Sequence, residues 1–252
     1  MRIRSLVLTT ELALANTRGT IEDRGDYLVV KTPDDPGYYY GNLLVMPAPP
    51  QVGEVAFWTR RFHDHFPDAE HVTLWWDGVS GDPGAEDELV AAGFTIERAV
   101  VMTADAIVRR EPELLVRELR AGEITEQLAW EIADRHDEPY HRFLQRRAAW
   151  QRTLVERGIA KFWGAFAGDA LVASLGLVEL GSLGRYQDVQ TLPAYRGRGL
   201  ASALLYAAAR AASVARVIVL AARSDLYERA GFRVIERTVS ACRYPLSERS
   251  SR

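Results

Sequence analysis

The stretch of sequence that decides the fold reads Val189-Gln190-Thr191-Leu192-Pro193-Ala194-Tyr195-Arg196-Gly197-Arg198-Gly199-Leu200-Ala201. It begins as a β-branched run, passes through a glycine-rich turn and ends in the small residues of a helix start. Such a turn exposes backbone N–H groups, and the helix after it is positive at its N-terminus. Gly197 and Gly199 let a ligand approach the main chain, while Arg196 and Arg198 add positive charge. The stretch favours a phosphate site over the alternative, an ordinary corner with exposed arginines.

The same turn differs from two common nucleotide loops. It lacks the Gly-Lys-Ser/Thr ending of a nucleoside triphosphate loop and the three-glycine spacing of a dinucleotide fold. An RNA-contacting loop is a third interpretation, but the formal net charge of -3 and the lack of an interleaved basic and aromatic surface argue against it.

Composition describes a globular chain. It has 252 residues, 48% hydrophobic and 26% charged, which is enough for one large or two small domains. Cys242 is the single cysteine, so we expect a buried packing thiol and a reducing compartment. No apolar stretch is long enough to span a bilayer. These features predict a cytoplasmic protein with neither a membrane nor a nucleic-acid partner.

The second half of the chain alternates strands and helices around the glycine turn. We expect strands at residues 114–119, 160–167, 170–180, 185–192, 216–222 and from 232 to about 244, with helices at 125–136, 143–156, 200–212 and 225–230. The first half predicts strands at 27–31, 43–46, 71–76 and 94–103, with helices at 10–16, 52–66 and 86–92. This order predicts an α/β fold with a mixed sheet.

Two segments of the chain resemble each other. Residues 88–98 and 227–237 each contain a short helix, a Gly-Phe corner and a strand with Ile-Glu-Arg. Gly93 and Gly231 are expected to close these helices in a left-handed conformation. The similarity favours two copies of one α/β unit over convergence on a common corner, although the first copy lacks the phosphate turn. We therefore predict domains at residues 1–110 and 111–246, followed by a polar tail at 247–252.

The histidines do not form a convincing metal motif. His63 and His65 lie two apart, which puts them on different faces of a helix, and His71 follows in a strand. Surface or packed core histidines are the better interpretation, so no metal is expected.

On its motifs the chain resembles the GCN5-related N-acetyltransferase (GNAT) superfamily over about residues 114–244. The resemblance rests on Val189-x-Thr191-x-Pro193-x-x-Arg196-Gly197-x-Gly199-Leu200-Ala201, which fits the family's Gln/Arg-x-x-Gly-x-Gly/Ala motif, and on Leu226-Tyr227-Glu228-x-x-Gly231-Phe232. The order of elements agrees as well. The resemblance implies a GNAT-like fold, with two tandem units of which the first is degenerate.

The resemblance also implies a reaction, in which a primary amine attacks acetyl-CoA directly. The acetyl-CoA-binding residues it implies are Val189, Gln190, Thr191, Arg196, Gly197, Arg198, Gly199, Leu200, Ala201 and Ser224. The edge of the strand would pair with the pantetheine arm, and the Val189 N–H would stabilise the oxyanion. Tyr227 would protonate the leaving thiolate, its alternative being a buried aromatic residue.

The general base is where the chain departs from the family. The family often carries Glu or His on the strand before the turn, but those positions fall on Arg185 and Gln187. Asp188 and Glu179 are the remaining candidates, although strand alternation predicts that Asp188 faces the other side of the sheet. A water-mediated base, or a base from the first half, is the other possibility.

Two functions follow. The first is an acetyl-CoA-dependent N-acetyltransferase that acts on an amine of a small molecule, a peptide or a protein. The alternative is a regulatory GNAT-like protein that binds acyl-CoA with little or no turnover, which the missing base motivates. The predicted assembly is a monomeric pseudo-dimer or a homodimer.

Overall fold

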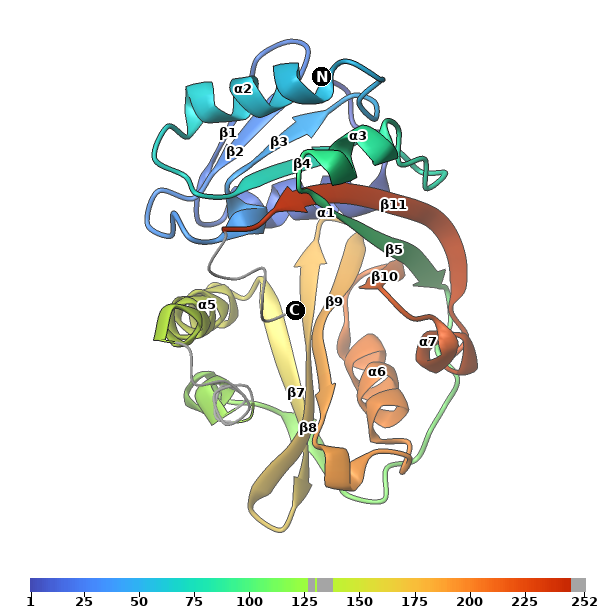
Figure 1. Cartoon of the computed structure of the whole chain (residues 1–252). Helices are drawn as coiled ribbons and strands as arrows, with labels where there is room; N and C mark the ends of the chain where they lie inside the picture. Colours follow the sequence, from blue (N-terminus) through green and yellow to red (C-terminus); the bar gives the residue numbers. More distant parts are fainter. Residues whose placement is uncertain (127–129, 131–137, 246–252) are drawn as a thin grey trace. The chain divides into compact units, whose positions relative to one another are not determined.

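The computed structural model describes residues 1–126, 130 and 138–245, and it divides into two compact units (Figure 1). The first unit is Met1–Val101 together with Glu236–Arg252, and the second is Met102–Ile235. The predicted domain boundaries at residues 110 and 246 stay a prediction. The expected tail at 247–252, and most of the expected helix at 125–136, lie outside the described residues.

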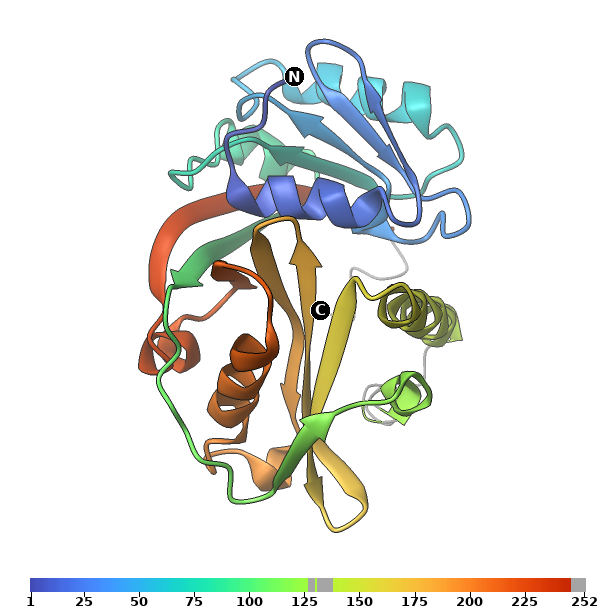
Figure 2. The same cartoon turned by 180° about the vertical axis from the view of Figure 1, so that it is seen from behind.

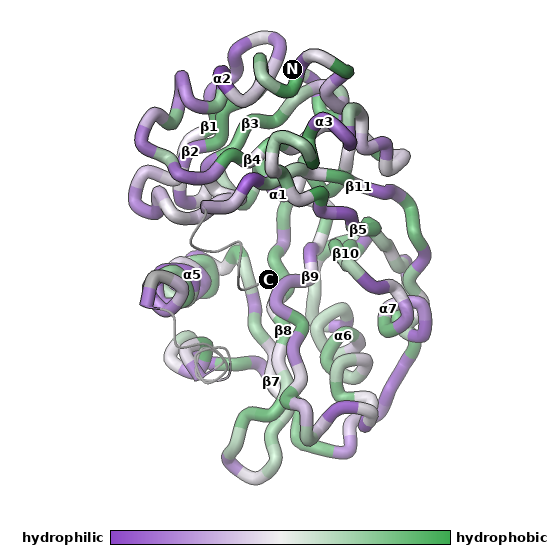
Figure 3. The backbone as a smooth tube through the Cα atoms, viewed as in Figure 1, coloured by the Kyte–Doolittle hydropathy of each residue, from purple (hydrophilic) through white to green (hydrophobic). Residues whose placement is uncertain are grey.

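The first unit is built around a buried apolar sheet. Its elements are α1 (Leu6–Ala15), β1 (Thr20–Asp23), β2 (Leu28–Lys31), η1 (Tyr39–Gly41), β3 (Leu43–Met46), α2 (Val55–His65), β4 (Val72–Trp76), α3 (Glu86–Ala91), most of β5 (Thr95–Ala104) and most of β11 (Arg233–Arg243). The predicted apolar stripe of α2 is confirmed, because Val55 and Phe62 are buried and Trp58 and Phe66 pack against the same core. Figure 3 shows the hydrophobic colour along β3 and β4, which are buried along their lengths.

The strand order in the first unit is β1-β2-β3-β4-β11. β3 and β4 are parallel with Leu44 opposite Leu74, and α2 makes the crossover between them. The neighbouring pairs are antiparallel, including β11 against β4 with Ala241 opposite Leu74. Cys242 lies in this last strand and is fully buried, as its sequence context predicts.

The second unit carries the glycine turn. Its elements are β6 (Leu115–Glu118), η2 (Ala121–Thr125), α5 (Glu138–Glu156), β7 (Ala160–Ala167), β8 (Ala170–Leu180), β9 (Leu183–Thr191), η3 (Pro193–Tyr195), α6 (Leu200–Ala211), β10 (Arg216–Ala221) and α7 (Asp225–Arg229). The strand order is β10-β9-β8-β7-β6, and the end of β5 hydrogen-bonds beside β10 through Thr103 and Val217. α5 and α6 cover opposite faces of this sheet (Figures 1 and 2). The predicted α/β class with a mixed sheet is therefore confirmed.

Each unit repeats the same succession of elements. An antiparallel pair is followed by a strand, a helix and a parallel strand: β1, β2, β3, α2 and β4 in the first unit, and β7, β8, β9, α6 and β10 in the second. A short helix then ends at a glycine with positive φ, Gly93 or Gly231, as predicted. When these two glycines are matched, Leu89 stands where the second unit has Tyr227, and both backbone carbonyls accept the N–H of the corner phenylalanine.

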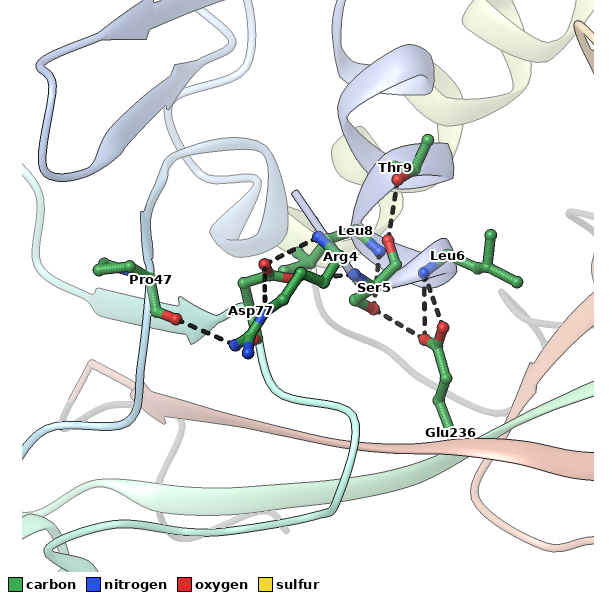
Figure 4. A network of polar contacts seen from close by, with 8 residues as sticks. All are labelled: Arg4, Ser5, Leu6, Leu8, Thr9, Pro47, Asp77 and Glu236. Atoms are coloured by element: carbon green, nitrogen blue, oxygen red, sulfur yellow. Dashed lines mark hydrogen bonds and ion pairs between the residues drawn. The ribbon is translucent and has the colours of Figure 1, made fainter. Parts of the chain in front are cut away.

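A buried polar network closes the first unit around the N-terminus of α1 (Figure 4). Asp77 accepts the backbone N–H groups of Arg4 and Ser5, each at 2.8 Å. Glu236 accepts the Ser5 hydroxyl at 2.8 Å and the Leu6 N–H at 2.9 Å. Both carboxylates are buried, and they occupy the positive end of the helix, where negative charge is stabilising.

We expect Glu236→Ala to destabilise the protein by about 2–4 kcal/mol, because the buried Ser5 hydroxyl and Leu6 N–H would both lose their acceptor. A urea titration followed by circular dichroism would measure the shift. Arg237→Ala, which removes an exposed side chain of the same strand, is the matched control with an expected change within about 0.5 kcal/mol. Equal unfolding midpoints for Glu236→Ala and the wild type would contradict the prediction.

The three histidines of the first unit have separate partners. His65 lies 2.9 Å from the Tyr27 hydroxyl, His71 lies 3.1 Å from the Asn42 carbonyl, and His63 lies 3.3 Å from Arg243. Among the described residues there is no group of His, Cys, Asp and Glu that could hold a metal ion. Likewise, none of the described helices is both long and apolar enough to cross a membrane. The cytoplasmic location stays a prediction.

Candidate acyl-donor site

A cavity of about 890 Å³ lies where β9 gives way to α6. Its lining includes eight of the ten predicted acetyl-CoA-binding residues: Val189, Gln190, Thr191, Arg196, Gly197, Gly199, Leu200 and Ala201. Arg198 and Ser224 are outside this lining. The cavity is also lined by four residues that were not among those predicted: Trp130, Ser202, Leu226 and Arg229. The size is in the range typical of a small-molecule site.

The glycine turn has the backbone geometry of an open cradle. Gly197 and Gly199 have φ angles of 78° and 76°, in the left-handed region that favours glycine. Nothing lies within 4 Å of the position that a Cβ would take on Gly197. Gly199 is the N-cap residue of α6, and no side chain caps the helix there. The first N–H groups of α6 are therefore left for another acceptor.

β9 separates from β10 just before the turn. The two strands pair only from Leu183 to Tyr186, although β9 continues to Thr191. The edge of β9 beyond Tyr186 therefore has no partner in β10, and Val189, Gln190 and Thr191 of this edge line the cavity. An extended ligand can add to such an edge as a further strand does.

A β-bulge interrupts β9 at the same place. Gln187 lies opposite Gly176 and Gln190 opposite Ser174, so Asp188 and Val189 together oppose a single residue of β8. Asp188 has a φ of 49°, which makes it the one described residue other than glycine with positive φ. The bulge therefore shifts the alternation of side chains along β9 just before the glycine turn.

The bulge also overturns one expectation about Asp188. Tyr186 donates its hydroxyl to the Leu205 carbonyl of α6, so strand alternation would turn Asp188 toward α6 as well. Instead the Asp188 carboxylate accepts a hydrogen bond from Gln151 of α5 at 2.5 Å and lies 3.8 Å from the Arg147 guanidinium. The extra residue of the bulge shifts the alternation by one position, and Asp188 therefore faces α5.

Glu179, the other candidate base, lies away from the bulge. It stands opposite Gly184 at the start of β9, and its carboxylate accepts the Ser213 N–H at 3.2 Å. Five residues of strand separate Gly184 from Val189, which corresponds to roughly 16 Å. The structure does not bring Glu179 together with the other predicted site residues.

Tyr227 lies on α7 between two residues that line the cavity, Leu226 and Arg229. Its ring packs edge-on against Phe232 with 5.8 Å between ring centres, and Phe232 packs in turn against Tyr186. Burial raises the pKa of the Tyr227 hydroxyl, because the phenolate would lose solvation. The hydroxyl therefore stays protonated at neutral pH and can serve as a proton donor.

The surroundings of the cavity are strongly positive. Arg196 and Arg229 line it, and Arg198 belongs to the same turn, where its guanidinium lies 5.0 Å from the ring centre of Tyr195. Arg196 donates to the Thr191 carbonyl at 3.1 Å. Across the described part of the chain no carboxylate forms an ion pair with these three arginines. In a chain with a net charge of -3, this local excess favours a ligand with several negative charges.

Comparison with known proteins finds a family model that matches part of the second unit. Residues 158–234 match the family model of the acetyltransferase (GNAT) domain, a range that includes the glycine turn, the bulge and Tyr227. No curated protein matches the chain.

Solved structures agree with this fold. A functionally unknown conserved protein from Staphylococcus epidermidis has a TM-score of 0.70 at 11% identity, with 90% of this chain and 95% of that chain covered. A GCN5-related N-acetyltransferase from Kribbella flavida has a TM-score of 0.68 at 15% identity, with 97% and 96% covered. A tandem GNAT protein from the clavulanic acid biosynthesis pathway has a TM-score of 0.53 at 13% identity, with 89% and 83% covered. These likenesses bear on the fold alone, and they confirm that it is GNAT-like.

Proposed function

We propose, from the premise that residues 158–234 form a domain of the GNAT superfamily, that the protein is an N-acetyltransferase that uses acetyl-CoA as the acyl donor. The observation that carries the proposal is the separation of β9 from β10 beside an arginine-lined cavity. A free strand edge suits the amide groups of pantetheine, and a glycine turn before a helix suits a diphosphate. Both features adjoin one cavity, as a single ligand with these two parts requires.

The binding residues divide by the part of the donor they would hold. Val189, Gln190 and Thr191 would pair with the pantetheine arm through their main chain. The turn from Arg196 to Ala201 would hold the diphosphate through backbone N–H groups and guanidinium charge. Ser224, at the start of α7, is kept as a candidate for a contact near Tyr227.

The proposed chemistry is direct transfer. A neutral amine attacks the thioester carbonyl, and the Val189 N–H stabilises the oxyanion of the tetrahedral intermediate. When the carbon–sulfur bond breaks, the Tyr227 hydroxyl donates its proton to the leaving thiolate, and the phenolate then takes a proton back from water. Arg185 and Gln187 are not bases, so the ammonium proton of the attacking amine leaves to water. For Asp188 we propose a positioning role, because its carboxylate is already engaged by Gln151 and Arg147.

We propose further that catalysis belongs to the second unit alone. The first unit has Leu89 where the second has Tyr227, and it has no counterpart of the arginine-glycine turn. A tandem arrangement with one degenerate copy accounts for both differences and for the repeated order of elements. The acceptor is then a primary amine of a small molecule, a peptide or a protein, and the assembly is a pseudo-dimer within one chain or a homodimer.

The alternative function is regulatory binding of acyl-CoA with little turnover. The observation in its favour is that neither Arg185 nor Gln187 can act as a base and that Asp188 is held by its neighbours. Both functions require the donor site, and they differ only in turnover.

Calorimetric titration of the full chain with acetyl-CoA, followed by a thiol-release assay with a panel of primary amines, tests the proposal. We expect a micromolar dissociation constant and CoA release that depends on at least one amine. Saturable binding without amine-dependent release would favour the regulatory protein. No binding at millimolar acetyl-CoA would contradict both functions.

A further inference from the structure

Arg110 lies against the glycine turn, although it belongs to no motif. It is part of the hydrophilic segment that leaves β5 and leads to β6 within the second unit (Figures 2 and 3). A Cβ placed on Gly199 would lie 2.6 Å from the Arg110 Nε, 2.9 Å from Nη2 and 3.0 Å from Cζ. The guanidinium therefore packs directly over the glycine at the N-cap of α6, and a side chain at position 199 would displace it.

This placement is electrostatically unfavourable for the protein alone. The N-terminus of a helix carries a partial positive charge, and a guanidinium beside it is repelled. Nothing in the described part of the chain compensates, because Arg110 has no ion pair and no hydrogen bond there, whereas its neighbour Arg109 pairs with Glu111. Arg110 does not line the cavity itself, but Gly199, which it contacts, does, and so does Arg196, which brings a second guanidinium to this turn. Two guanidinium groups and a helix N-terminus around one open turn make a site for an anion with more than one charged oxygen.

We propose that Arg110 is a phosphate clamp, a side chain that closes over the diphosphate of acetyl-CoA from outside the GNAT motif. The inference rests on the proposed function and adds a binding residue to it. The diphosphate would lie between the N–H groups of the turn and the Arg110 guanidinium, which can donate two parallel hydrogen bonds to phosphate oxygens. Gly199 then has two tasks: it adopts the left-handed N-cap conformation, and it leaves room for the guanidinium.

The test compares Arg110→Ala with Arg109→Ala, a matched control that removes an exposed arginine of the same segment. We expect Arg110→Ala to weaken acetyl-CoA binding about tenfold in calorimetry, as the loss of one charge-assisted contact implies. The loss should be the same with 3′-dephospho-CoA and absent with pantetheine, which has no phosphate. Arg109→Ala should bind all three as the wild type does, and Arg110→Lys should fall between Arg110→Ala and the wild type.

The unliganded variant supplies a second measurement. Removal of a cation from the positive end of α6 should leave the thermal unfolding midpoint of Arg110→Ala unchanged or raise it. Weaker binding without loss of stability is the signature of a ligand contact, whereas a lower midpoint would identify Arg110 as a structural residue and overturn the clamp.

Three further outcomes keep the clamp separate from the proposed function. If the wild type binds acetyl-CoA and Arg110→Ala binds it equally well, the clamp is wrong and the proposed function stands. If Arg110→Ala loses affinity for acetyl-CoA but not for 3′-dephospho-CoA, Arg110 contacts the 3′-phosphate and the assignment to the diphosphate is wrong. If the wild type binds none of the three, the proposed function itself has failed.

Discussion

Tyr227→Phe is expected to lower kcat by about two to three orders of magnitude and to leave the affinity for acetyl-CoA unchanged, because general acid catalysis contributes about 10²–10⁴. The substitution removes only the hydroxyl, so the edge-on packing against Phe232 is kept. Without this proton donor the thiolate must leave unprotonated or take its proton from water. Thiol release measures the turnover, and calorimetry measures the binding of acetyl-CoA.

Tyr206→Phe is the matched control for this experiment. Tyr206 is on α6 of the same unit and does not line the donor cavity, so its hydroxyl should not affect turnover. The pH profile gives an independent readout. Burial raises the pKa of Tyr227, so the hydroxyl should lose its proton only above pH 10, the ordinary pKa of tyrosine. Deprotonation of Tyr227 should therefore not lower the wild-type rate at any pH below 10. Equal turnover of Tyr227→Phe and the wild type would mean that Tyr227 only packs, as Leu89 does at the matching position of the first unit.

The parts of the site that sequence predicts well are those set by local backbone chemistry. Gly197, Gly199 and Gly231 all have positive φ, a requirement that glycine meets at low cost and that other residues rarely meet. The turn, the helix start and the Gly-Phe corner each lie within a few residues of such a glycine. Their spacing along the chain, together with the resemblance to the GNAT superfamily, predicted ten binding residues, eight of which line one cavity. That these residues bind acetyl-CoA stays a prediction.

The bulge in β9, in contrast to these glycine positions, has no local sequence signal that predicts it. Asp188 adopts a conformation in which glycine and asparagine are commoner, and the residue that holds it, Gln151, lies on a helix 37 residues earlier. Regular alternation is the right expectation for an isolated strand, but here it placed Asp188 on the wrong face of the sheet. Arg110 was missed for a related reason: a polar segment between strands carries no periodicity, and its contact with Gly199 depends on the path of the chain.

The partner of the last strand was equally beyond sequence reasoning. The sequence predicted a strand from 232 to about 244 without naming its neighbour, and residues 240–243 of β11 pair with β4 of the first unit. The alternating pattern of a strand specifies a buried face and leaves its neighbour open. The carboxylate of Glu236, which binds the N-terminus of α1, could be assigned only with this pairing known.

The second large effect is expected at Asp188, where two substitutions should separate positioning from base catalysis. Asp188→Asn should keep at least about a third of the wild-type kcat, because asparagine tolerates positive φ and its side-chain oxygen can still accept from Gln151. Asp188→Ala should lower kcat about a hundredfold. Alanine cannot make the contact to α5 and disfavours the left-handed conformation, so we expect the bulge to relax. The Val189 N–H would then no longer reach the oxyanion, and a rate about a hundredfold lower is typical for the loss of one oxyanion donor.

Base catalysis predicts a different pattern for the same variants. An amide cannot take a proton from the attacking amine, so Asp188→Asn and Asp188→Ala would both lose about 10²–10⁴ in kcat. Asp188→Gly separates conformation from contact, because glycine accepts positive φ but cannot reach Gln151, and positioning predicts a rate between those of the other two variants. Calorimetry would measure the affinity of all three variants for acetyl-CoA. An affinity within threefold of the wild type would show that the substitutions change the rate of acyl transfer and leave binding of the donor intact. Rates that fall in the order Asn, Gly, Ala therefore mean that Asp188 holds the strand in place, whereas equally large losses in the Asn and Ala variants mean that the carboxylate takes the proton.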